Sequence, residues 1–179
     1  MEYILAFIIA LVLNFVGMII PGMITLKIVS LQHKKGIQDA LLFALGVAFV
    51  EFFQTIATLR FSSLFADFFK SHTEIKWIVV IVLSVLAFSL FFSKPNKPNN
   101  LEVESEEDNY RKTSFIKGMF LSLFNLLKYP FWIFQGVYFL NSGILKTDMF
   151  SIVFFSAGAT IGAFAMYFIY IKLGQVLLE

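Results

Sequence analysis

The stretch Asn14-Phe-Val-Gly-Met-Ile-Ile-Pro-Gly-Met-Ile-Thr-Leu-Lys-Ile-Val-Ser-Leu31 is an apolar helical run that Pro21 and Gly22 interrupt. A second apolar run, residues 114–140, is interrupted at Lys128-Tyr129-Pro130, about as far into its segment. Proline removes a backbone donor and clashes with the carbonyl four residues back, so each interruption frees polar backbone groups at a depth where lipid offers no partner. Paired interrupted helices at matching positions indicate a substrate site in the middle of the membrane.

The composition of the chain places it in a bilayer. Of its 179 residues 59% are hydrophobic and 15% are charged, and the mean hydropathy is +0.82, which is more apolar surface than a soluble domain can bury. The net charge of +2 and the absence of a basic patch exclude nucleic acid as a partner. The absence of cysteine excludes disulfides and thiolate metal sites.

Five apolar runs are long enough to cross a membrane, and a polar stretch divides them into two groups. The runs cover residues 3–31, 37–59, 75–92, 114–140 and 149–173. Residues 93–113 are rich in Lys, Pro, Asn and Glu and cannot bury a core, so we expect a flexible linker. The sequence predicts an all-α, polytopic membrane protein with membrane repeats over residues 1–92 and 114–179.

The basic residues predict how the chain is oriented, because cytoplasmic loops carry an excess of Lys and Arg. The side of the linker carries Lys27, Lys34, Lys35, Lys94, Lys97, Arg111, Lys112, Lys117 and Lys172. The opposite side carries Arg60, Lys70, Lys76 and Lys146. We therefore expect a cytoplasmic linker and an N-terminus outside the cell.

Four features together resemble the lysine exporter (LysE/RhtB) family of small amino-acid exporters. They are a Pro-Gly pair in the first helix (Pro21-Gly22), a short basic loop that ends in Gly36, Gly46 followed by four residues and then Glu51, and a polar linker before a second broken helix. The resemblance implies two inverted three-helix repeats, a monomeric or dimeric carrier in the plasma membrane, and export driven by the proton-motive force.

The chain departs from the pattern of that family in three places. The second proline that usually follows Pro-Gly is Met23, and the Asn-Pro of the fourth helix is replaced by Asn125-Leu-Leu-Lys-Tyr-Pro130. Five spans are visible where the resemblance implies six, so we expect a divergent or C-terminally shortened member.

Glu51 is the strongest candidate for a functional residue. A carboxylate inside an apolar span is costly, and is normally paired, protonated or directed into a cavity. Gln54, Thr55 and Thr58 follow at spacings that place them on the same helical face. This polar stripe is typical of a transport pathway in which the carboxylate binds and releases protons. A carboxylate that only fixes helix packing is the alternative.

Lys128 is the natural opposite charge. If the helix breaks beside Pro130, Lys128 can hold a carboxylate while Glu51 holds an ammonium, which suits a zwitterionic amino acid. A lysine that extends its charge to the interface is the alternative. Asn14 and Asn125 each precede a proline and are candidates for the substrate pathway, although a structural role, in which they bind carbonyls freed by the breaks, is favoured. Gln135 and Thr160 are weaker candidates to face the interior.

The sequence favours a proton-coupled exporter of amino acids or related small metabolites over two alternatives. One is a membrane scaffold without transport, with Gly158 and Gly162 as a docking face. The other is a metal-ion carrier, although a divalent cation wants several oxygen ligands and the spans offer one well-placed carboxylate. We predict no enzymatic activity, no cofactor and no metal site, because catalytic motifs are missing from the sequence.

Overall fold

The computed structural model describes residues 2–71, 81, 110–126 and 128–176. Every regular element within them is a helix: α1 (Glu2–Gly17), α2 (Met23–Lys35), α3 (Ile37–Ser71), α5 (Tyr110–Leu123), α6 (Lys128–Asn141) and α7 (Met149–Val176). The all-α prediction therefore holds for the described part of the chain. The predicted span over residues 75–92, apart from Ile81, and most of the predicted linker lie outside the described residues. Helix α5 begins at Tyr110, inside the stretch predicted as linker.

Within the described residues two helices, α3 and α7, are continuous and long enough to cross a membrane. Their apolar parts, Ile37–Ser63 and Met149–Gly174, contain 27 and 26 residues. At about 1.5 Å per residue each extends for roughly 40 Å, which exceeds the thickness of the hydrocarbon core. Both agree with the spans that the sequence predicts over residues 37–59 and 149–173.

The first predicted span is divided into α1 and α2. Helix α1 ends at Gly17, α2 begins at Met23, and Pro21 and Gly22 lie in between. Helix α2 continues through the basic residues to Lys35, and Gly36 alone joins it to α3 with φ of +89°. The expected basic loop is therefore the last turn of α2, where positive charges complement the helix dipole.

The second broken run is divided into α5 and α6, slightly earlier than predicted. The interruption lies between Leu123 and Lys128, and Pro130 belongs to the first turn of α6. A proline in the first turn lacks only an N–H that has no partner within the helix, so it begins α6 without disturbing it.

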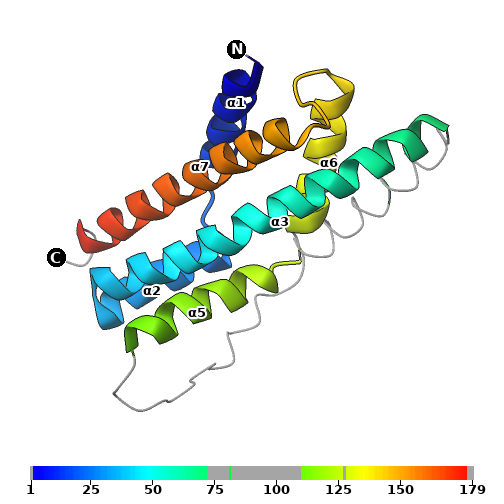
Figure 1. The fold of residues 1–179 in the computed structure, drawn as a ribbon. Helices are drawn as coiled ribbons and strands as arrows, with labels where there is room; N and C mark the ends of the chain where they lie inside the picture. The colour runs from blue at the N-terminus through cyan, green and yellow to red at the C-terminus, as the bar shows by residue number, and fades with distance from the viewer. Residues whose placement is uncertain (1, 72–80, 82–109, 127, 177–179) are drawn as a thin grey trace.

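Close contacts between helices join the two halves of the chain. In Figure 1, α5 runs alongside α3 and α1 packs against α7. A Cβ atom on Gly46 of α3 would lie 2.1 Å from the Phe115 oxygen, and one on Gly158 of α7 would lie 2.2 Å from the Phe7 oxygen. Lipid gives helices no hydrophobic reason to associate, so such close backbone packing is what holds them together.

The buried apolar side chains form two clusters at different depths along α3 and α7. The first, named here the Trp132 cluster, contains Ala6, Ala10, Leu59, Trp132, Phe139, Leu145, Ile152, Phe155 and Ala159. The second, the Tyr167 cluster, contains Ile24, Ile28, Ala40, Phe43, Ala44, Val47, Ala163, Tyr167 and Ile171. Helices α1 and α6 contribute to the first cluster and α2 to the second, so the interruptions lie between the two.

Charged residues lie at both ends of the helices. Glu2 forms an ion pair with Lys146. The hydrogen bond from Lys146 and its positive charge hold the pKa of Glu2 below its ordinary value. Arg60 donates to the Thr147 oxygen at the same end. At the other end Lys117 interacts electrostatically with Lys35 and Lys27. The two groups are those that the sequence assigns to opposite sides, and which group faces the cytoplasm stays a prediction.

Candidate functional site

Glu51 lies in the middle of α3 and is the centre of the candidate site. It is 1% exposed. Its Oε1 accepts a hydrogen bond from Nδ2 of Asn14 at 3.1 Å, and its Oε2 lies 2.8 Å from Nζ of Lys128. The structure thus brings together three of the predicted site residues, from α1, α3 and α6.

Asn14 connects this carboxylate to α7. It lies in the last turn of α1, and its Nδ2 also donates to the Ala159 oxygen at 2.7 Å. The sequence predicts that Asn14 binds a carbonyl freed by the break in its own span. The structure shows instead that it binds a carbonyl of an intact helix and the acidic side chain of α3, so it links both halves of the chain.

Lys128 is the first residue of α6, where the helix dipole is positive and a lysine is unfavourable. Its position is stabilised by Glu51. The contact between Nζ and Oε2 is an ion pair without the alignment of a hydrogen bond, and neither atom has a hydrogen-bond partner among the described residues. Lys128 is 15% exposed and Glu51 is almost fully buried, so the pair lies in a low-dielectric setting. Both charges keep unused hydrogen-bonding capacity.

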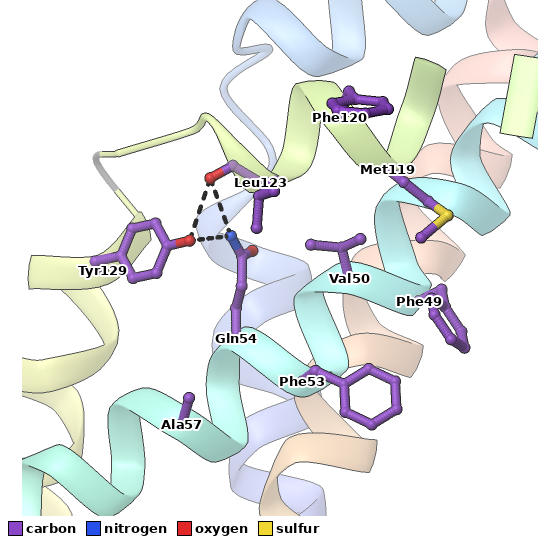
Figure 2. A pocket seen from close by; sticks show the side chains of 9 residues that line it. All are labelled: Phe49, Val50, Phe53, Gln54, Ala57, Met119, Phe120, Leu123 and Tyr129. Atoms are coloured by element: carbon purple, nitrogen blue, oxygen red, sulfur yellow. Dashed lines mark hydrogen bonds between the residues drawn. The ribbon is translucent and has the colours of Figure 1, made fainter. Parts of the chain in front are cut away.

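Gln54 binds the end of α5, as Figure 2 shows. Its Nε2 donates to the Ser122 oxygen at 3.1 Å and to the Tyr129 hydroxyl at 2.8 Å. That hydroxyl donates in turn to the Leu123 oxygen. Gln54 therefore satisfies carbonyls freed by the second interruption, which is the role that the sequence assigns to asparagines.

A tyrosine of α7, Tyr170, binds the backbone of the first interruption in a similar way. The Tyr170 hydroxyl contacts the Met18 and Ile19 oxygens that follow the end of α1. Sequence reasoning missed Tyr129 and Tyr170. An aromatic hydroxyl near a predicted break is a usable signal, since tyrosine is a common partner for exposed polar groups within an apolar region.

Two further predicted site residues, Thr55 and Asn125, resemble Gln54 in making no hydrogen bond to the carboxylate of Glu51. The Thr55 hydroxyl donates to the Glu51 backbone oxygen, one turn back in the same helix. Asn125 lies in the second interruption, where its backbone N–H donates to the Ser122 oxygen and its backbone oxygen accepts from the Lys128 N–H. Their positions stabilise the backbone around the site.

A side pocket of about 450 Å³ opens beside Gln54, between α3 and the interruption of α5 and α6 (Figure 2). It is lined by Phe49, Val50, Phe53, Gln54, Ala57, Met119, Phe120, Leu123 and Tyr129. The polar groups of Gln54 and Tyr129 are already bound to the end of α5. The pocket therefore offers apolar surface and no free charge.

The charged site lies between the two apolar clusters. Along α3, Glu51 follows Val47 of the Tyr167 cluster and precedes Leu59 of the Trp132 cluster. Along α7, Ala159 belongs to the Trp132 cluster and Ala163, one turn later, to the Tyr167 cluster. The carboxylate is thus covered by apolar side chains toward both ends of the helices, and we call this arrangement, in which Glu51 is buried, the closed state.

The sequence as a whole matches one family model. The model, described as LysE type translocator, covers residues 15–179, which include both interruptions and two of the three site residues, Glu51 and Lys128. The chain belongs to the LysE translocator family. This confirms the resemblance seen in its motifs. LysE translocators are integral membrane transporters of amino acids or related compounds, and are not enzymes. No curated protein and no solved structure matches the chain.

Proposed function

We propose that this LysE translocator exports amino acids, or small metabolites with the same pair of charges, and binds them between Glu51 and Lys128. The observation that carries the proposal is the ion pair of these two residues, 2.8 Å apart and buried between the interruptions of α1–α2 and α5–α6. In the closed state each charge neutralises the other. A zwitterion can replace both contacts at once, with its ammonium on Glu51 and its carboxylate on Lys128.

The surroundings of the two charges favour such an exchange. Lys128 and the positive end of α6 form one region of positive potential, which is satisfied either by Glu51 or by a carboxylate of the substrate. Glu51 keeps the amide of Asn14 as a fixed donor on Oε1, so only Oε2 has to change its partner. A substrate that carries a single charge would leave one member of the pair buried and unpaired, which is costly.

Proton coupling follows from the same carboxylate. A proton on Glu51 and an ammonium beside Glu51 neutralise the same charge, so the two compete. Release of the substrate on one side and uptake of a proton on that side then become linked steps. Lys128 from α6 is the charged group paired with Glu51 in this state.

The arrangement of the helices supports alternating access by two inverted repeats. Each half contains an interrupted span followed by a continuous one, α1–α2 with α3 and α5–α6 with α7. The Trp132 cluster would separate on one side of the membrane, and the Tyr167 cluster on the other. We assign the side of Lys27 and Lys35 to the cytoplasm and the location to the plasma membrane.

The alternatives explain the contacts less well. A scaffold would need Gly158 and Gly162 as a docking face, whereas both glycines already contact the backbone of α1 at Phe7 and Leu11. A metal-ion carrier would place a cation beside Lys128, whose charge repels it. In the described part of the chain no three His, Asp or Glu side chains gather as ligands.

The experiment is efflux of a panel of labelled amino acids from preloaded proteoliposomes under an imposed pH gradient. We expect gradient-dependent efflux of at least one amino acid, lost in Glu51→Gln and in Lys128→Met. The matched control is Glu2→Gln, because Glu2 is a carboxylate with 68% exposure at the start of α1. Efflux that survives Glu51→Gln unchanged would refute the role of the ion pair.

A further inference from the structure

Six buried side-chain polar atoms have no hydrogen-bond partner within the described ranges. Two of them, Oε2 of Glu51 and Nζ of Lys128, belong to the ion pair. The other four are the hydroxyls of Ser156, Thr160 and Tyr167 and the amide oxygen of Gln32. Since a buried polar group without a partner costs free energy, such groups are uncommon and need a reason.

Three of the remaining atoms belong to α7 and the fourth to Gln32 of α2, and together they form one row along α7. At 100° per residue, positions 156, 160, 167 and 174 fall within about 40° of one another around the helix. Gly174 has no side chain, and a Cβ atom on it would lie 3.3 Å from Oε1 of Gln32, so Gln32 of α2 takes the last place in the row. The row extends for roughly 27 Å, close to the thickness of the hydrocarbon core.

The row passes the charged site. Asn14 binds both the oxygen of Ala159, next to Thr160, and the carboxylate of Glu51. Tyr167 belongs to the same cluster as Val47, which lies one turn before Glu51 on α3. Ser156 therefore lies on the side of the Trp132 cluster, Tyr167 and Gln32 lie on the side of the other cluster, and Thr160 lies at the level of the ion pair.

We propose that Ser156, Thr160, Tyr167 and Gln32 are the polar wall of the transport path, and that their free groups bind the zwitterion and its water when the helices around Glu51 separate. The inference rests on the proposed function and identifies the surface along which the substrate moves. Hydroxyl and amide groups bind both an ammonium and a carboxylate, so a single row serves both ends of an amino acid. In the closed state these groups have lost their water and have no protein partner, which costs free energy. This cost favours separation of the helices.

Cysteine labelling tests this wall without knowledge of the substrate. The chain contains no cysteine, so Ala163→Cys introduces a single thiol between Thr160 and Tyr167, at a position that is 0% exposed in the closed state. We expect a small, water-soluble methanethiosulfonate to modify this thiol in proteoliposomes. Thr160→Val or Tyr167→Phe in the same background should slow the modification by about fivefold or more, because the closed state loses an unsatisfied group.

Stability separates this role from a structural one. Tyr167→Phe and Thr160→Val should leave the unfolding temperature unchanged or raise it, since the removed hydroxyls have no partner in the closed state. The matched controls are Tyr138→Phe, a tyrosine with 65% exposure, and Thr58→Val, whose hydroxyl donates to Gln54 and Thr55. Neither control should change the labelling of position 163.

The outcomes distinguish the inference from the proposed function. If efflux depends on Glu51 but position 163 never reacts, or reacts equally in all variants, the wall is refuted and the ion-pair site stands. If no amino acid is transported but labelling and stability behave as expected, the wall stands and the substrate assignment falls. Lower unfolding temperatures for Tyr167→Phe and Thr160→Val would show that their hydroxyls have structural partners, which contradicts the inference.

Discussion

Asn14 is the residue on which the candidate site depends most directly, because one amide group binds two helices of different halves. Its Nδ2 holds the Glu51 carboxylate and an oxygen of α7 at the same time. The carboxylate is thereby fixed on one oxygen and left exchangeable on the other. Hydrogen bonds between membrane helices contribute modestly to stability on average. We therefore expect Asn14 to fix the position of the Glu51 carboxylate more than to stabilise the fold.

The ion pair predicts an effect of charge balance on stability. Glu51→Gln or Lys128→Met alone leaves one buried charge without its partner and should lower the free energy of unfolding by about 3–5 kcal/mol. The double variant should recover most of this loss, because it removes both charges. Denaturant unfolding in detergent measures all three. Equal loss in the double variant would contradict a direct pairing.

Gln54 predicts a smaller effect, through the backbone. Gln54→Leu leaves the oxygens of Ser122 and Leu123 with fewer donors, and should cost about 1–3 kcal/mol of unfolding free energy. Thr58→Val is the control, because its hydroxyl bonds only to its own helix. An unchanged stability for Gln54→Leu would mean that another donor reaches the end of α5.

At the scale of elements, glycines decide which helices pack together. Gly46 and Gly118 allow α3 and α5 to touch backbone to backbone, and Gly158 and Gly162 do the same for α7 and α1. The first part of each interrupted span is thus fixed to the continuous helix of the other half. The later parts belong to different apolar clusters, since α6 contributes to the Trp132 cluster and α2 to the Tyr167 cluster.

The same substitution should have opposite effects at different glycines. Gly46→Ala and Gly158→Ala place a methyl group about 2 Å from a backbone oxygen, so the helices must separate at a cost of about 1–3 kcal/mol or more. Gly17→Ala meets nothing within 4 Å and should be neutral or stabilising. Thermal unfolding of the three variants checks this, and equal behaviour would contradict the close packing.

At the scale of the molecule, charge is separated between the two ends of the helix bundle, and the site lies between them. Glu2, Arg60 and Lys146 gather at one end, and Lys27, Lys35 and Lys117 at the other. Large apolar side chains such as Ile20 and Met23, more than 79% exposed, face outward in between. This distribution suits a lipid surface between two aqueous ones.

The separation predicts a transmembrane topology that labelling can measure. In the cysteine-free chain, Lys146→Cys should react with an impermeant maleimide from outside intact cells. Lys34→Cys should react only after permeabilisation, because the excess of basic residues places its end in the cytoplasm. Reaction of both from the same side would contradict the assignment of the two ends.

The sequence by itself determined the membrane class, the family and the two interrupted spans, and it singled out Glu51 and Lys128, whose role stays a prediction. These depend on composition, proline chemistry and the cost of charge in lipid, all of which are local properties. The partners of the polar side chains were decided by tertiary structure. Asn14 reaches α3 and α7, Gln54 binds α5, and the free hydroxyls of α7 align along one line. Helix rotation and contacts between distant segments set these pairings, and spacing along one helix does not specify them.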